Sequence, residues 1–220
     1  MEFRELTEGR LIQRPSIDRD DLSVETSGFK GDFDLEYSLV EAGEQAGVTG
    51  EGSVAHSVVR HVDLSGSRLD PVTLVDTAFE DVDLSNASVQ RATARRVEML
   101  RCRAIGLRLS IEQASDLCVE GCRLDFAAIH IEKVKGIAAF IGCSFRETVI
   151  SGCLSGVVFL DCDFVDTEFE VASAKGCDLR MSRLVGARGL LSLRGALITA
   201  EQAVSVAHRL ATEAGLIVRD

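Results

Sequence analysis

The sequence predicts an all-β solenoid, in which the chain coils around a narrow core with four strands in each turn. Hydrophobic residues recur at every fifth position from His61 onward, and a column of small side chains recurs about every twenty. The 220 residues are 46% hydrophobic but include only 2 prolines and no tryptophan. A period of five fits neither an α-helix nor a straight strand. It fits a chain that points two residues inward, three outward, and turns a corner in every block.

The blocks are clearest after residue 60, where the chain reads HVDLS GSRLD PVTLV DTAFE DVDLS NASVQ. The fourth residue of each block, its centre, is apolar, as at Leu64 and Leu84. The residue two before it is small or β-branched, as at Val62 and Val82. Four blocks make a square coil, and successive coils would pair as strands about 4.8 Å apart. The repeat from Leu64 to Gly189 therefore predicts a rod of roughly 30 Å.

A ladder of inward positions tests this coil. Four of the seven cysteines fall into it, with successive spacings of 20, 21 and 19 residues. The ladder reads Val62, Val82, Cys102, Cys122, Cys143, Cys162 and Ser182. The centres shift in step, with one residue inserted between Val134 and Phe140 and one removed between Ile150 and Leu154. We therefore predict a bulge and its compensation there.

These blocks resemble the pentapeptide-repeat family, whose pattern is A(D/N)LXX. HVDLS and DVDLS fit the pattern closely, while RATAR, GLRLS and SIEQA depart from it. The resemblance covers roughly residues 50–195 and implies a right-handed quadrilateral β-helix of pentapeptide repeats. We expect an irregular N-terminal cap over residues 1–52, the β-helix over 53–196, and a C-terminal capping helix over 197–220.

The two ends depart from the period. In the N-terminal cap, residues 17–22 and 31–35 are expected to form acidic strands or turns, which could include a hairpin, and residues 43–52 a loop. Near the other end, Thr199 and Gln202 form a capping box, which predicts a helix from Ala200 to about Ala214, ended by Gly215.

The apolar side of this helix has two interpretations, a cap over the last coil or a contact between two copies. Gyrase-directed members of the family dimerise through this end, so the resemblance implies a homodimer, which Leu210→Glu should dissociate. The candidate contact residues are Ala203, Val206, Ala207, Leu210, Ala214, Leu216 and Ile217.

Nothing in the sequence indicates catalysis. The four histidines lie outside any metal or catalytic motif, and no phosphate-binding glycine loop is present. The cysteines suit a dry core better than a metal site. A packed rod also offers no cavity. We therefore predict no enzyme activity, no catalytic or metal-binding residues and no cofactor.

The net charge of −11 disfavours nucleic acid as a ligand. No run of 18 apolar residues predicts a membrane span, and the first residues do not resemble a signal peptide. We expect a cytoplasmic protein that binds neither membrane nor nucleic acid, with its thiols reduced.

The resemblance implies one specific function. Gyrase-protecting members are acidic rods that mimic DNA and occupy the cationic DNA-binding surface of gyrase or topoisomerase IV, which gives resistance to antibiotics that poison these enzymes. The alternative is a general protein-interaction scaffold with no topoisomerase contact. If a basic partner is contacted, the candidate residues are Asp161, Asp163, Asp166, Glu168 and Glu170.

The charge is uneven, which weakens a simple mimicry argument. Residues 1–60 hold 13 acidic and 6 basic residues. Residues 61–90 hold 6 acids and 1 base, and residues 91–108 hold 6 arginines and 1 acid. Asp83 with Arg103 and Asp163 with Arg183 are predicted to be neighbours on adjacent coils. Mimicry then depends on whether the N-terminal segment folds against the rod.

Overall fold

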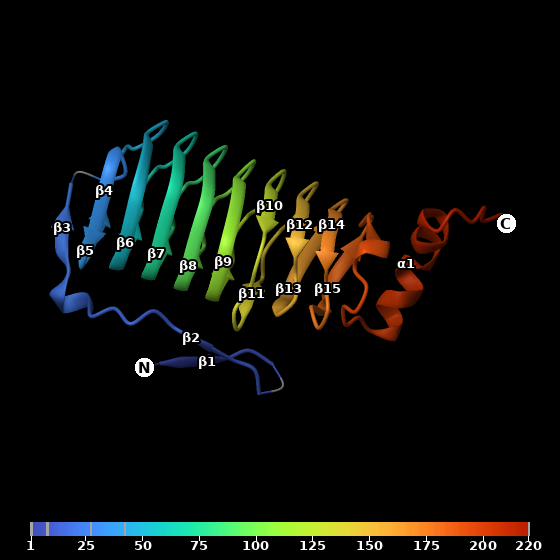
Figure 1. Ribbon diagram of the computed structural model, residues 1–220. Coiled ribbons are helices and arrows are strands. Elements are labelled where there is room, and N and C mark those ends of the chain that lie inside the picture. Colours follow the sequence, from blue (N-terminus) through green and yellow to red (C-terminus); the bar gives the residue numbers. More distant parts are fainter. Residues whose placement is uncertain (1, 8, 27, 42, 220) are drawn as a thin grey trace.

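The computed structural model describes residues 2–7, 9–26, 28–41 and 43–219 and forms a four-sided β-solenoid (Figure 1). Most strands belong to one continuous sheet that winds around the axis and pairs in parallel. The elements are β1 (Phe3–Glu5), β2 (Leu11–Gln13), η1 (Arg19–Asp21), β3 (Ser23–Glu25), β4 (Gly31–Glu36), β5 (Ser38–Glu41), β6 (Thr49–Arg60), β7 (Arg68–Glu80), β8 (Ser88–Leu100), β9 (Arg108–Glu120), β10 (Ala128–Ile131), β11 (Ala138–Ile141), β12 (Val149–Cys153), β13 (Val157–Val165), β14 (Glu168–Ser173), β15 (Asp178–Val185), η2 (Leu190–Ser192) and α1 (Ala200–Glu213).

Corners of the coil explain the five-residue period. A residue with left-handed backbone recurs at this spacing, as at Asp76, Asp81, Asn86, Arg91 and Arg96, whose φ angles lie between 49° and 57°. Each such residue turns the chain, so that the following pair of inward side chains meets the core from the next side. Long elements such as β8 therefore bend around a corner.

The register of the strands confirms the 20-residue coil and its irregularity. Leu74 pairs with Ala94, and Phe79 with Met99. Phe140 instead pairs with Val119, 21 residues earlier, and with Phe159, 19 residues later. The pairing of β12 with β14 then shifts between Gly152 and Cys153. The insertion and its compensation lie where the sequence predicted them.

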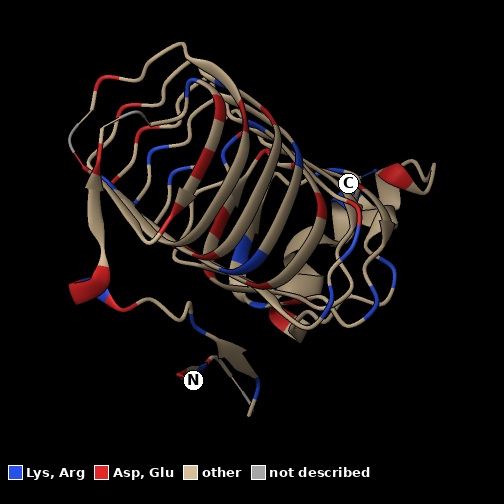
Figure 2. Ribbon diagram, turned by 60° about the vertical axis from the view of Figure 1, so that its left-hand side comes forward, with Lys and Arg blue, Asp and Glu red and all other residues tan. Residues whose placement is uncertain are grey.

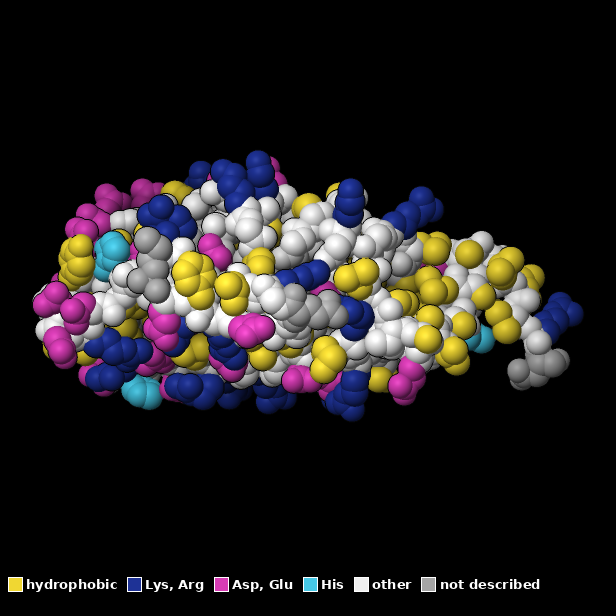
Figure 3. Space-filling view, turned by 90° about the horizontal axis from the view of Figure 1, so that it is seen from below, with side chains coloured by type: hydrophobic (Ala, Val, Ile, Leu, Met, Phe, Trp, Pro, Cys, Tyr) yellow, Lys and Arg dark blue, Asp and Glu magenta, His cyan; other side chains and the backbone are white. Residues whose placement is uncertain are grey.

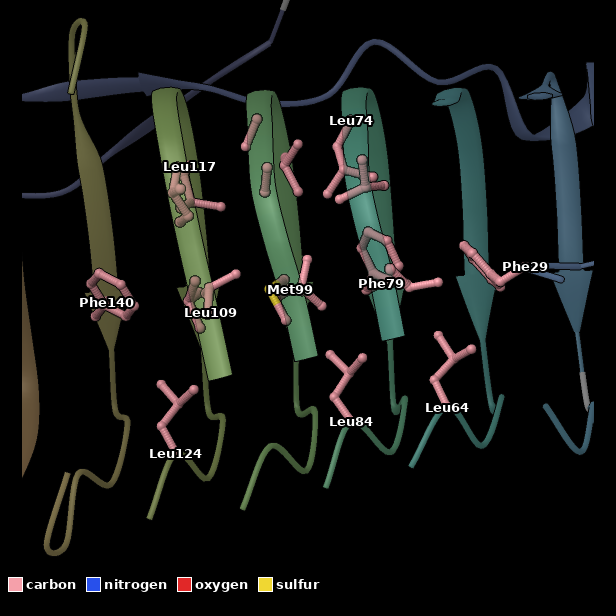
Figure 4. A pocket seen from close by; sticks show the side chains of 18 residues that line it. Phe29, Leu64, Leu74, Phe79, Leu84, Met99, Leu109, Leu117, Leu124 and Phe140 are labelled. Atoms are coloured by element: carbon pink, nitrogen blue, oxygen red, sulfur yellow. The ribbon is translucent and has the colours of Figure 1, made fainter. Parts of the chain in front are cut away.

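The core changes in character along the rod. Its C-terminal half contains stacked phenylalanines, with ring centroids 5.2 Å apart for Phe140 and Phe159 and 5.0 Å apart for Phe145 and Phe164. The middle coils contain aliphatic and small residues and leave an apolar cavity of about 60 Å³, so the expectation of a rod without a cavity is wrong (Figure 4). Leu74 and Ala94 are among the side chains that line it.

The N-terminal segment differs from the expected cap. The ladder already includes β4, whose residues Asp32 and Leu35 pair with Glu51 and Val54 of β6. Regular pairing thus begins before residue 53, and Thr49 onward is strand rather than loop. The antiparallel pair of β1 and β2 lies along the side of the rod in Figure 1 instead of closing its end.

The predicted C-terminal helix and its capping box are confirmed. Thr199 caps α1, its side chain accepts a hydrogen bond from the Gln202 backbone N–H, and the Gln202 side chain accepts one from the Thr199 N–H. Gly215 follows the helix with a φ of 82°, as a left-handed C-terminal glycine should.

Candidate interaction surfaces

One outward column shows how the coils pair their charges. The parallel bridges bring Asp83 next to Arg103, and Asp163 next to Arg183. The side-chain nitrogen of Arg183 lies 2.7 Å from Asp163, and that of Arg103 lies 3.9 Å from Asp83. Both predicted neighbour pairs are confirmed.

The arginines of residues 91–108 are largely neutralised by the coil before them. Arg91 pairs with Asp70 at 2.6 Å, and Arg101 pairs with Asp81 at 2.8 Å. Arg96 holds the buried carboxylate of Asp76. Acidic and basic segments accordingly lie on neighbouring turns in Figure 2. Exposed pairs of this kind contribute only about 0–1 kcal/mol each, but they place a carboxylate beside Arg91, Arg96, Arg101 and Arg103, which lowers the net positive charge of this part of the surface.

The predicted acidic cluster, residues 161–170, is spread over two faces and their corners. Asp163 pairs with Arg183, and Glu168 lies 3.3 Å from Arg188. The exposed carboxylates of Asp161, Asp166 and Glu170 carry no ion pair with any residue of the described ranges. The cluster therefore presents three unneutralised charges, not five.

A second acidic surface was missed from the sequence. Asp32, Asp34 and Glu36 alternate along β4 and point outward, and Glu51 lies beside Asp32 in β6. A shallow groove runs between them, with Phe33 on its wall. Acidic side chains gather at this end of the rod in Figure 3. The alternation of Asp-Phe-Asp-Leu-Glu was the available signal, but it lies before the clear five-residue period.

The first residues form a strap across one face of the rod. We call residues 2–7 and 9–22 the N-terminal strap, and the outward residues of 78–80, 98–100, 118–120 and 139–141 the strap face. Arg14 binds Glu98 through two hydrogen bonds of 2.8 and 3.1 Å. Arg4 binds Glu120 in the same way, and Arg19 pairs with Glu80. The segment thus folds against the rod with its arginines on rod carboxylates.

Backbone and apolar contacts complete the attachment of the strap. The N–H of Ser16 donates to Asp76 at 2.9 Å, and that of Gln13 to Asp116 at 3.2 Å. Ile12 is 1% exposed and packs against Cys118 and Ala139. Burial raises the pKa of the Cys118 thiol to about 12, so this thiol is held neutral under the strap.

Strap contacts also perturb the carboxylates. The hydrogen bonds from Arg4 lower the pKa of Glu120. Burial by itself would raise the pKa of Asp76, but the hydrogen bonds from Arg96 and the Ser16 N–H outweigh it and lower the pKa. Both groups are therefore ionised partners of the strap at neutral pH.

The C-terminal end combines a cap with an exposed apolar surface. Val206 is buried on the last coil, Leu210 is half-buried against the same core, and the Gln202 side chain donates to the carbonyls of Leu179 and Ser182. The other five predicted contact residues are exposed, as the apolar surface at that end of Figure 3 indicates. They are Ala203, Ala207, Ala214, Leu216 and Ile217.

The cysteine ladder points into the core as predicted. The thiol of Cys122 lies 3.5 Å from the carbonyl oxygen of Met99, and its sulfur accepts the backbone N–H of Cys102 at 3.3 Å. Across the described ranges, no group of three His, Cys, Asp or Glu side chains is placed to hold a metal ion.

The square coil, its five-residue corners and its stacked columns define a pentapeptide-repeat β-solenoid. Solved structures of this fold resemble the chain. QnrB1, a plasmid-mediated fluoroquinolone resistance protein, matches in trypsin-treated form with a TM-score of 0.42 and 16% identity over 90% of this chain and 99% of that one. HetL, a pentapeptide repeat protein involved in heterocyst differentiation regulation in the cyanobacterium Nostoc, matches with a TM-score of 0.38 and 14% identity over 76% of this chain and 86% of that one. At these identities and TM-scores, neither likeness indicates what this chain does.

No family model and no curated protein matches the sequence. Within the described part of the chain, no helix has the length and hydrophobicity needed to cross a membrane.

Proposed function

We propose that this protein is a non-catalytic interaction rod whose partner is a type II DNA topoisomerase, gyrase or topoisomerase IV. The observation that carries the proposal is the set of exposed carboxylates left after the coils have paired their charges, at Asp161, Asp166 and Glu170. Such a surface complements the basic groove in which a topoisomerase holds DNA. By occupying that groove, the rod would protect the enzyme from antibiotics that trap it on DNA.

The family resemblance supports the choice of partner, and QnrB1 is a fluoroquinolone resistance protein. The net charge of −11 favours basic protein surfaces over nucleic acid. We further propose a cytoplasmic homodimer joined at the C-terminal end, where Ile217 is 82% exposed and Leu216 is 63% exposed. Two rods joined at this end would present both acidic clusters to one two-fold symmetric enzyme.

A supercoiling assay with and without a fluoroquinolone tests this function. The protein should protect gyrase from the drug, and the triple variant Asp161→Lys, Asp166→Lys, Glu170→Lys should lose protection. The matched control reverses three exposed acids elsewhere, Glu112→Lys, Glu132→Lys and Glu201→Lys, and should keep it. No effect of the wild-type rod, even in large molar excess, would exclude a gyrase partner.

The second candidate is an interaction scaffold with no topoisomerase contact. The ion pairs of Arg91, Arg96 and Arg101 with the preceding coil favour it, because they leave the middle of the rod close to neutral. A neutral middle interrupts the continuous negative charge of a DNA duplex. Inactivity toward both gyrase and topoisomerase IV, with another protein retained in stoichiometric complex, would select this function.

A further inference from the structure

The strap face is not built as a solvent surface. Ala78, Glu98, Cys118 and Ala139 point away from the core, and beneath the strap each is at most 5% exposed. Equivalent outward residues on another face, such as Arg103 and Arg183, are exposed. The row from Ala78 to Ala139 is apolar except for Glu98, and Glu80 and Glu120 lie in the row beside it. Such a face requires a cover that carries aliphatic and cationic side chains, and the strap supplies both.

The strap is attached without being part of the solenoid ladder. β1 and β2 pair with each other in a separate two-stranded sheet. The strap contacts the rod through ion pairs, through hydrogen bonds that involve carboxylates or His56, and through the packing of Ile12. A gap of about 190 Å³ remains between the strap and the rod beside Arg14 and Ala78. The strap can therefore leave without breaking any hydrogen bond of the sheet.

We propose that the strap face is a binding surface for an extended, arginine-bearing segment of a partner protein, and that the strap occupies this surface in cis. The carboxylates of Glu98 and Glu120 receive guanidinium groups two bonds at a time, an arrangement that arginine provides and lysine does not. Cys118 and Ala139 receive an aliphatic side chain between them, where Ile12 now lies. This proposal does not rest on a topoisomerase partner.

The strap and the partner segment compete for the same face of the rod. A partner segment binds only in the fraction of molecules whose strap is detached, so its apparent affinity is reduced by that fraction. Weakening the strap should therefore strengthen binding in trans, while removing the rod carboxylates should abolish it. A purely structural strap would show neither effect.

The first measurement follows the opening of the strap in the full chain. Cys118 is the outward-facing thiol under Ile12, whereas Cys143 points into the core. In Arg4→Ala/Arg14→Ala, maleimide labelling of Cys118 should accelerate by about tenfold or more, with Cys143 still protected. The matched control Arg183→Ala/Arg188→Ala removes two exposed ion pairs on other faces and should leave Cys118 protected. Circular dichroism verifies that the variants are folded. If the double variant does not fold, the same labelling of Cys118 is measured in the single variant Arg14→Ala.

The second measurement tests binding in trans. A fluorescent peptide with the sequence of residues 2–22 is titrated into full-length Arg4→Ala/Arg14→Ala and followed by anisotropy. Saturable binding is expected, weaker to wild type and lost when Glu98→Gln and Glu120→Gln are added. Absence of saturable binding, or binding that survives loss of both carboxylates, overturns the proposal. So does a dimer that exchanges straps between copies, detected by light scattering as a dimer that persists in the Ile217→Glu background, where the proposed C-terminal contact is removed, with Cys118 still protected.

Discussion

At the inward position two before each centre, the side chain does more than fill space. Thr77 donates to the carbonyl of Val54 at 3.0 Å, and Thr148 to that of Leu124 at 2.6 Å. Cys143 makes the same contact with Val119. A small group with one donor fits under the corner and satisfies a carbonyl of the preceding coil, which explains why cysteine, serine and threonine alternate with valine there.

Asp76 is the residue on which corner, coil and strap converge. Its carboxylate is buried and accepts bonds from Arg96 Nε at 2.6 Å and the Ser16 N–H at 2.9 Å. Asp76→Asn should lower the free energy of unfolding at pH 7 by about 1–3 kcal/mol, because it leaves charged donors without a charged acceptor. Urea unfolding followed by circular dichroism measures this difference.

The same variant gives a pH signature. Because the pKa of Asp76 is lowered in the folded protein, its stabilisation is present above the unfolded value of about 3.9 and is lost as the pH falls through the folded pKa. The gap between wild type and Asp76→Asn should therefore shrink below about pH 4. The control Asp161→Asn, at an exposed corner, should leave the free energy of unfolding nearly unchanged at both pH 7 and pH 3. A gap that persists unchanged at pH 3 would contradict this interpretation.

Among the elements, the central strands are less well packed than those that follow. Ala94 of β8 lines the 60 Å³ cavity, and valine suits a strand. Ala94→Val should raise the free energy of unfolding by about 0.5–1 kcal/mol. Thermal and urea unfolding measure the change.

Ala138 of β11 provides the control for this cavity. It is fully buried between Leu117 and Val157 and does not itself line the cavity. Ala138→Val should lose about 1–3 kcal/mol through overpacking. Equal effects of the two substitutions would show that the central cavity does not accept another side chain.

The coils were predictable because each inward residue finds its neighbours at a constant interval. Even the slip near Gly152 was visible, since two columns moved together. The strap was not predictable in this way. Its contacts join Arg4 to Glu120 and Arg14 to Glu98, pairs whose separations follow no period. The sequence marks residues 2–22 as irregular, but their place on the rod depends on a face that exists only after the coils have stacked.

For the whole molecule, charge and oligomeric state decide function together. Ion pairs between coils neutralise much of the negative charge of residues 61–90. The unpaired negative charge therefore lies near the N-terminal end and around Asp161. Of the candidate site, the acidic residues 161–170 were predictable from the sequence, but which of their carboxylates are neutralised was not. That distinction depends on which side chains the coil register places opposite each acid.

The dimer prediction needs a different variant from the one the sequence suggests. Leu210 packs against its own core, so Leu210→Glu would also disturb the cap. Ile217→Glu alters an exposed position and should convert a dimer to a monomer with unchanged melting temperature. Light scattering at micromolar concentration measures the mass. Val24→Glu, at an exposed site near the opposite end of the rod, is the control, and a monomeric wild-type protein would refute the prediction.

The strap has one more consequence, for cooperativity. In a solenoid each repeat touches only its neighbours, so unfolding can begin at one end and proceed coil by coil. Here Arg19, Arg14 and Arg4 fasten three successive coils at Glu80, Glu98 and Glu120. The strap therefore couples coils that are not adjacent. Unfolding that begins at one end must detach the strap before it reaches the next coil, which favours the loss of these coils as a single unit.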